Sequence, residues 1–115
     1  MGATMTNLEY HVLLALAQGP LYGYAIKDAV AAESSGTIAP RAGSLYRVLA
    51  RLMSAGLVKE VSPRGDVPAH PGLARKYYAL TAPARVALLA ESHRLKQAAA
   101  MAERRLGIAS RSSRS

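Results

Sequence analysis

Residues 43–53, Gly43-Ser44-Leu45-Tyr46-Arg47-Val48-Leu49-Ala50-Arg51-Leu52-Met53, are the stretch of this 115-residue sequence that most constrains the fold. Their apolar side chains recur at i, i+3, i+4, i+7 and i+8, which predicts a helix with one buried face. We expect this helix to begin near Gly43, with Ser44 as its N-cap, and to run to Gly56. Arg47 and Arg51 lie one turn apart on the opposite side.

Two shorter helices are predicted before this stretch. The first begins at Thr6-Asn7-Leu8-Glu9, where a hydroxyl and a carboxylate three residues apart form a capping box. It ends at Gln18-Gly19-Pro20, because glycine suits a left-handed cap and proline cannot continue a helix. The second helix covers residues 22–30, and Ser34-Ser35-Gly36 ends it. Its predicted inward residues are Ala25, Ile26, Ala29 and Val30.

After the third helix the pattern changes to that of strands. Residues 57–61 and 75–80 read as two strands, and the proline- and glycine-rich residues 62–74 between them read as a loop. Three helices followed by a β-hairpin are typical of a winged helix-turn-helix. The sequence therefore predicts a mostly helical α+β fold, with a DNA-binding domain over residues 1–80.

The last predicted helix begins at Thr81-Ala82-Pro83 and extends to Gly107, about 39 Å at 1.5 Å per residue. A core this small cannot cover such a length, so we expect residues 81–107 to pair with a second copy in a homodimer. The alternative is one broad face packed on its own domain. The Ser/Arg-rich residues 108–115 are expected to be a disordered basic tail. The predicted dimer seam has coiled-coil spacing and consists of Leu88, Ser92, Leu95, Ala99, Ala102 and Leu106.

Composition argues against several classes of protein. The chain has no cysteine, which excludes disulfides, thiol nucleophiles and cysteine-type zinc sites, and its three histidines are too far apart to suggest a metal site. We therefore predict neither an enzyme nor a cofactor. No apolar run approaches the roughly 18–20 residues of a membrane span. We expect a cytoplasmic protein with no membrane partner.

The charge favours a polyanionic partner. The formal net charge is +8, and residues 37–76 alone hold seven basic residues against Glu60 and Asp66. The basic residues belong to the approach to the third helix, to its outward face and to the hairpin. In a helix-turn-helix the third helix enters the major groove, so double-stranded DNA is the predicted partner.

The roles of several side chains have a second interpretation. Arg47 and Arg51 contact DNA or merely keep an exposed face soluble, and Lys76 contacts DNA or pairs with Glu60 across the hairpin. Tyr46 is a core aromatic or a phosphate-contacting hydroxyl. For the whole protein, the alternative is a winged-helix protein-interaction module without operator-specific DNA binding. A basic amphipathic membrane binder is disfavoured because Glu91 and Glu103 interrupt the polar face of the last helix.

Four segments together resemble the PadR-type transcriptional regulators. They are Gly19-Pro20-Leu21-Tyr22-Gly23-Tyr24-Ala25-Ile26, the stretch 43–52, Gly56-Leu57-Val58, and Arg75-Lys76-Tyr77-Tyr78-Ala79-Leu80-Thr81. They occur in the family's order and cover roughly residues 7–90. The sequence departs from the family at Pro83-Ala84, where a glycine-bearing turn is usual, and in a proline-rich wing loop that carries Asp66.

The resemblance implies a homodimeric winged-helix DNA-binding regulator, usually a repressor, whose C-terminal helix forms the dimer. Because such a dimer has two-fold symmetry, we expect it to bind a pseudo-palindromic operator. The single last helix looks like the short subfamily, in which a small-molecule effector lodges at or near the dimer interface. The six tyrosines and the lack of tryptophan do not support a pocket built from stacked tryptophans. Charge and resemblance together give the predicted DNA-binding residues: Arg41, Ser44, Tyr46, Arg47, Arg51, Arg64, Arg75 and Lys76.

Overall fold

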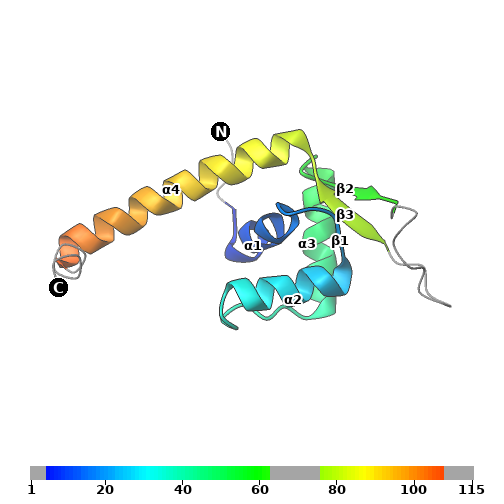
Figure 1. Cartoon of the computed structure of the whole chain (residues 1–115), viewed down its shortest axis with the longest axis horizontal. Coiled ribbons are helices and arrows are strands. Elements are labelled where there is room, and N and C mark those ends of the chain that lie inside the picture. Colours follow the sequence, from blue (N-terminus) through cyan, green and yellow to red (C-terminus); the bar gives the residue numbers. More distant parts are fainter. Residues whose placement is uncertain (1–4, 63–75, 108–115) are drawn as a thin grey trace.

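The computed structural model describes residues 5–62 and 76–107. Three helices and a small sheet form a compact body, and a fourth, long helix projects from it (Figure 1). This arrangement confirms the mostly helical α+β, winged-helix fold and the long last helix. The elements are α1 (Asn7–Leu16), β1 (Leu21–Tyr22), α2 (Gly23–Glu33), α3 (Ala42–Ser54), β2 (Val58–Val61), β3 (Tyr77–Leu80) and α4 (Ala82–Leu106).

The sheet is antiparallel with strand order β1-β3-β2. Val58 pairs with Leu80 in the hairpin, and Leu21 pairs with Tyr78 on the other side of β3. The two hairpin strands were predicted, but β1 was not, because two residues are too few to show an alternating pattern. Tyr22 was assigned to the second helix, whereas its backbone is extended and it is the N-cap of α2.

The core lies where α1, α2 and α3 meet the inner face of the sheet. Leu13, Leu16, Ile26, Leu45 and Leu49 are among its largest fully buried side chains. Burying one such side chain contributes about 1.5–3 kcal/mol, so these few residues dominate the stability of so small a domain. The predicted inward residues of the second helix are confirmed at Ile26 and Val30, which are buried.

The helix starts follow the predicted caps with one exception. The Thr6 hydroxyl accepts a hydrogen bond from the Glu9 amide, and the Glu9 carboxylate accepts one from the Thr6 amide, so the capping box is confirmed. Thr81 likewise caps α4. The prediction that Ser44 caps the third helix is wrong. The N-cap is Arg41, without a side-chain cap hydrogen bond, and Ser44 lies inside the first turn.

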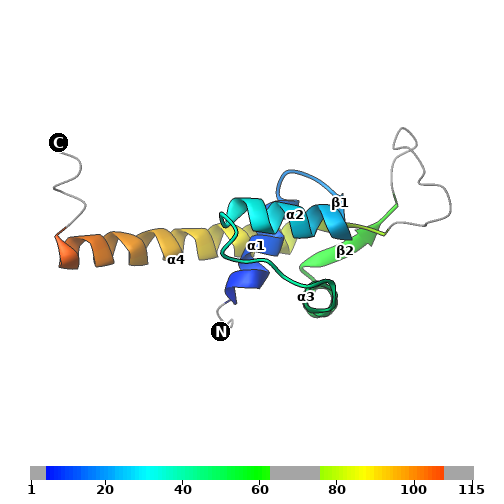
Figure 2. The same ribbon diagram turned by 90° about the horizontal axis from the view of Figure 1, so that it is seen from below.

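Helix α4 has 25 residues and is packed along only part of its length. Ala84 and Leu88 are buried in the core, whereas nearly every side chain beyond Ser92 is exposed. Figures 1 and 2 show the far part of α4 extending away from the other elements. Within residues 5–62 and 76–107, neither α4 nor any other helix combines the length and the apolarity needed to cross a bilayer.

Candidate nucleic-acid interface

The outward side of α3 begins with an exposed polar group at its first turns. The Arg47 guanidinium donates a 3.3 Å hydrogen bond to the Ser44 hydroxyl; Arg47 is exposed and Ser44 is half-buried. Arg41, at the N-cap, is exposed beside them. Figure 2 shows α3 nearly end-on at the edge of the molecule, where its outer side is open. These three side chains can reach an external anion without moving the core.

Arg51 is exposed but has a partner within the protomer. Its Nε donates a 2.7 Å charge-assisted hydrogen bond to Glu9 Oε2, which ties α3 to the first turn of α1. Burial favours a raised pKa for Glu9, but the Thr6 amide and the Arg51 guanidinium outweigh it, so the pKa is lowered. Arg51 therefore differs from Arg47, although both face outward one turn apart.

Tyr46 lies between α3 and the start of α2. A Cβ atom at Gly23 would collide with the Tyr46 hydroxyl, so this ring rests directly on the backbone of the first residue of α2. The ring is nevertheless 46% exposed. Tyr46 thus has its hydroxyl end packed on Gly23 while the residue as a whole stays partly exposed, and the absence of a side chain at Gly23 makes room for it.

The wing contributes one described basic residue from the prediction. Lys76 Nζ lies 3.9 Å from Glu60 Oε2 across β2 and β3, with both side chains well exposed. This is the cross-hairpin pairing that the sequence left open, and exposed pairs of this kind contribute little to stability. Arg64 and Arg75, the two other wing residues predicted to contact DNA, lie outside the described residues, as does the predicted basic tail.

Lys27 is a basic residue that the sequence analysis did not select. Lys27 and Asp28 of α2 line a hollow of about 390 Å³ together with Arg41 and Ala42 at the start of α3. The first helix of a helix-turn-helix crosses the DNA backbone, so this position is suited to a phosphate contact. Its sequence signal was weak, because Lys27 is an isolated cation outside the basic segment.

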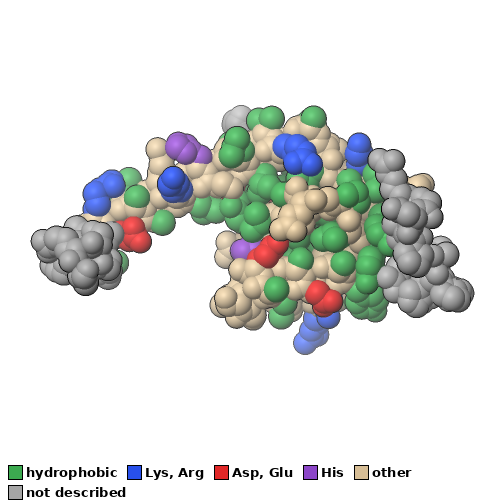
Figure 3. Space-filling model, in the orientation of Figure 1, with side chains coloured by type: hydrophobic (Ala, Val, Ile, Leu, Met, Phe, Trp, Pro, Cys, Tyr) green, Lys and Arg blue, Asp and Glu red, His purple; other side chains and the backbone are tan. Residues whose placement is uncertain are grey.

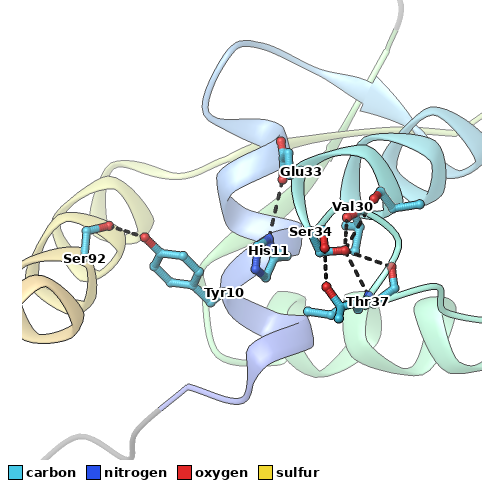
Figure 4. A network of polar contacts seen from close by, with 9 residues as sticks. Tyr10, His11, Val30, Glu33, Ser34, Thr37 and Ser92 are labelled. Atoms are coloured by element: carbon cyan, nitrogen blue, oxygen red, sulfur yellow. Dashed lines mark hydrogen bonds and ion pairs between the residues drawn. The ribbon is translucent and has the colours of Figure 1, made fainter. Parts of the chain in front are cut away.

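The six predicted dimer residues fall into two groups. Leu88 is buried in the core of its own protomer, and the Ser92 hydroxyl forms a 2.7 Å hydrogen bond with the Tyr10 hydroxyl of α1 (Figure 4). The other four, Leu95, Ala99, Ala102 and Leu106, are exposed. Large apolar side chains are also exposed elsewhere on α4, namely Val86, Leu89 and Met101.

A second polar contact joins α1 to α2. His11 Nδ1 lies 3.7 Å from Glu33 Oε1, and the same nitrogen is buried without a hydrogen bond (Figure 4). Burial raises the pKa of Glu33, partly opposed by His11. Residues 5–62 and 76–107 contain no cluster of histidine, aspartate and glutamate that could hold a metal ion. His11 and Glu33 are thus a helix–helix contact.

The family model of the Transcriptional regulator PadR-like family matches residues 12–90. The chain belongs to the PadR-like family of transcriptional regulators. The match extends from α1 to the first turns of α4, so it includes α3, the sheet and the packed start of the last helix. It ends before Ser92, beyond which nearly every side chain of α4 is exposed.

Solved structures show the same fold. A PadR family transcription regulator from hypervirulent Clostridium difficile R20291 superposes with a TM-score of 0.72 at 21% identity, covering 88% of this chain and 99% of that one. Bacillus subtilis PadR, solved in complex with operator DNA, superposes with a TM-score of 0.60 at 24% identity, covering 72% of this chain and 45% of that one.

A curated relative matches a shorter segment. An uncharacterized 37.1 kDa protein in transposon TN4556 of Streptomyces fradiae is 48% identical over 54 residues. The matched segment is 47% of this chain but only 15% of that protein, so the relative is much longer than the PadR-like unit described above.

Proposed function

We propose that this PadR-like regulator binds a pseudo-palindromic operator as a homodimer and represses transcription in response to a small molecule. The observation that carries the DNA-binding part is the pair of exposed arginines, Arg41 and Arg47, with the half-buried Ser44 between them at the first turns of α3. The N-terminal residues of the third helix contact base edges in a helix-turn-helix complex. The operator complex of Bacillus subtilis PadR supports the same use of this fold.

The side chains divide between base reading and phosphate contact. Arg47 has the fork geometry for guanine O6 and N7, and Ser44 orients it. Arg41 and Lys27 line a hollow at the start of α3 and are suited to the phosphate backbone. Arg51 and Lys76 have internal partners, so we assign them weaker contacts. The proposal also includes the hydroxyl of Tyr46 and, in the wing, Arg64 and Arg75.

We propose the homodimer because α4 leaves large apolar side chains exposed within the protomer. Leu106 is 69% exposed and Leu89 is 73% exposed, values that would be costly on a helix without a partner. A second copy related by a two-fold axis would cover these side chains and present two α3 helices to one duplex, with half-sites one helical turn apart or a multiple of it. The place of action would be the cytoplasm, with the DNA.

The test compares Arg47→Ala with Lys96→Ala, which removes the same charge from an exposed position on α4. Binding is measured by fluorescence anisotropy on DNA from upstream of the protein's own coding region and on unrelated DNA of equal length. Arg47→Ala should weaken specific binding about tenfold or more, because one bidentate base contact is worth about 1–3 kcal/mol.

Lys96→Ala should change operator affinity by less than about twofold, and wild-type binding should fall steeply with salt as counterions are released. Equal losses of operator affinity in the two variants would show that Arg47 contributes only its positive charge and makes no specific base contact. A wild-type protein with no preference for any operator would favour the protein-interaction module instead.

A further inference from the structure

The two arginines on the outward side of α3 have different neighbours. Arg47 donates to the neutral hydroxyl of Ser44, whereas Arg51 donates to the carboxylate of Glu9 in α1. The Arg51 contact uses Nε, which lies 2.7 Å from Glu9 Oε2. Among the residues that the structure describes, no partner occupies the terminal amino groups of Arg51, and its side chain is 56% exposed. Arg51 therefore keeps free donors for an external phosphate although one anion already lies beside it.

Glu9 is held in place by the start of its own helix. Its Oε1 accepts a 2.9 Å hydrogen bond from the Thr6 amide, and its side chain is only 14% exposed. Burial alone would raise the pKa of Glu9, but the Thr6 amide and the Arg51 guanidinium lower it, so the carboxyl is ionised at neutral pH. The capping box thus fixes a negative charge beside Arg51.

This ion pair lies on the side of the molecule where α3 is open. Figure 2 shows the start of α1 and helix α3 at the same lower edge. A phosphate that approaches the Arg51 guanidinium also approaches the carboxylate, because only 2.7 Å separates the paired atoms. Coulomb energy falls with the first power of distance, so the repulsion by Glu9 offsets much of the attraction by Arg51. Arg47 has no such opposing charge in its printed contact.

We propose that Glu9 competes with DNA phosphates for Arg51 and thereby limits the affinity of this regulator for DNA. In the complex, a phosphate must replace the carboxylate or share the guanidinium with it. The inference rests on the proposed binding of DNA through α3 and adds a residue that opposes that binding. Such a residue would reduce retention on non-specific DNA, where phosphate contacts supply nearly all of the affinity and competing sites are in vast excess.

Two other roles for Glu9 predict different results. If the carboxylate orients Arg51 toward a base, removing its charge weakens binding to the operator. If the pair only ties α3 to α1, removing the charge leaves the affinity for DNA unchanged. Competition predicts tighter binding, and it predicts this for any duplex, because phosphate contacts carry no sequence information.

The test variant is Glu9→Gln, which removes the charge and keeps an acceptor for the Thr6 amide. The matched control is Glu103→Gln, which makes the same change in net charge at an exposed position of α4. Glu103 lies in the far part of α4, where Figure 3 shows acidic and basic side chains close together. Fluorescence anisotropy measures binding to DNA from upstream of the protein's own coding region and to unrelated DNA of equal length, over a series of salt concentrations.

Glu9→Gln should bind both DNAs about fivefold more tightly, and the slope of log affinity against log salt should steepen by about 0.9, the value for one added phosphate contact. Glu103→Gln should stay within about twofold of wild type, because its distance from α3 lets salt screen the charge. Arg51→Gln should weaken binding about twofold in the wild-type background and about tenfold in the Glu9→Gln background, since the released guanidinium makes the gain.

An unchanged or weaker affinity in Glu9→Gln would overturn the inference. An equal gain in Glu103→Gln, or a gain that survives Arg51→Gln, would also overturn it. The proposed function fails in a different way: a wild-type protein that binds all DNA without preferring an operator contradicts that function, while the Glu9→Gln gain is still measurable on unrelated DNA. No binding to any DNA by any variant would overturn both.

Discussion

Helices α3 and α4 both repeat apolar residues at helical spacing, yet only α3 buries them within the protomer. Leu45 and Leu49 of α3 are fully buried, whereas Leu89 and Leu106 of α4 are mostly exposed. Each helix is also tied to α1 by one polar contact, Arg51–Glu9 for α3 and Ser92–Tyr10 for α4. The comparison shows that periodicity identifies an apolar face without identifying the surface that covers it.

The largest expected effect separates the two helices by stability. Leu49→Ala should lower the free energy of unfolding by about 2–5 kcal/mol, because it leaves a cavity in a packed core. Leu106→Ala, at an exposed position, should cost less than about 0.5 kcal/mol under conditions where the protein is monomeric. Urea denaturation measures both, and similar losses would show that α4 contributes to the protomer core beyond Leu88.

The next effect concerns assembly. Leu95→Glu should weaken dimerisation at least about tenfold, because a charge would be buried in the proposed α4 seam. The protomer should melt normally, since Leu95 is exposed within it. Sedimentation velocity across a concentration series gives the mass, with His93→Glu as the exposed control on the same helix. A stable Leu95→Glu dimer would mean that the two copies meet elsewhere.

Removing the polar contact between α4 and α1 should have a smaller effect on the stability of the protomer. Tyr10→Phe removes a half-buried hydroxyl that lies 2.7 Å from Ser92 Oγ, and we expect a loss of about 1 kcal/mol in thermal denaturation. Ser92→Ala should cost a similar amount, and the double variant should cost little more than either single one. Fully additive losses would show that the two hydroxyls act independently.

The smallest effect concerns the tie between α3 and α1. Glu9→Gln keeps an acceptor for the Thr6 amide but removes the charge facing Arg51, so we expect a loss of about 0.5 kcal/mol at neutral pH. The pKa of Glu9 is lowered in the folded state. Its contribution is therefore present above the ordinary pKa of 4.5 and is lost as pH falls through the lowered value.

Wild type and Glu9→Gln should thus differ in melting temperature at pH 7 and converge in acid. A constant difference at all pH values would assign the effect to packing rather than to charge.

Local signals predicted much of the fold. The capping box at Thr6, the cap at Thr81 and the apolar face of residues 43–53 depend on neighbours within a few residues, and all three are confirmed. The strand β1 was missed because its pairing with β3 joins residues far apart in the chain. The wrong cap at Ser44 came from residue preference, which the actual start at Ala42 overrides.

The candidate DNA-binding site was harder to predict from the sequence, because its contacts also join residues that are far apart in the chain. Nothing in the spacing of Arg47 and Arg51 shows that one of them meets Glu9, which is 42 residues away. The proximity of Lys27 to Arg41 likewise depends on how α2 turns into α3. Leu88 continues the periodic seam of α4 but lies in the protomer core. All three features depend on packing between residues far apart in the chain, which the periodicity of the sequence does not reveal.

Thr81 connects the two helices compared here. Its amide donates to the Leu57 carbonyl, its hydroxyl donates to the Gly56 carbonyl, and the same hydroxyl accepts from the Ala84 amide. Thr81 thereby connects the segment that follows α3 to the first turn of α4 through three hydrogen bonds. In a two-fold assembly through α4, the distance between the paired α3 helices follows from this junction. Thr81 would then help to determine how many base pairs separate the two half-sites of the operator.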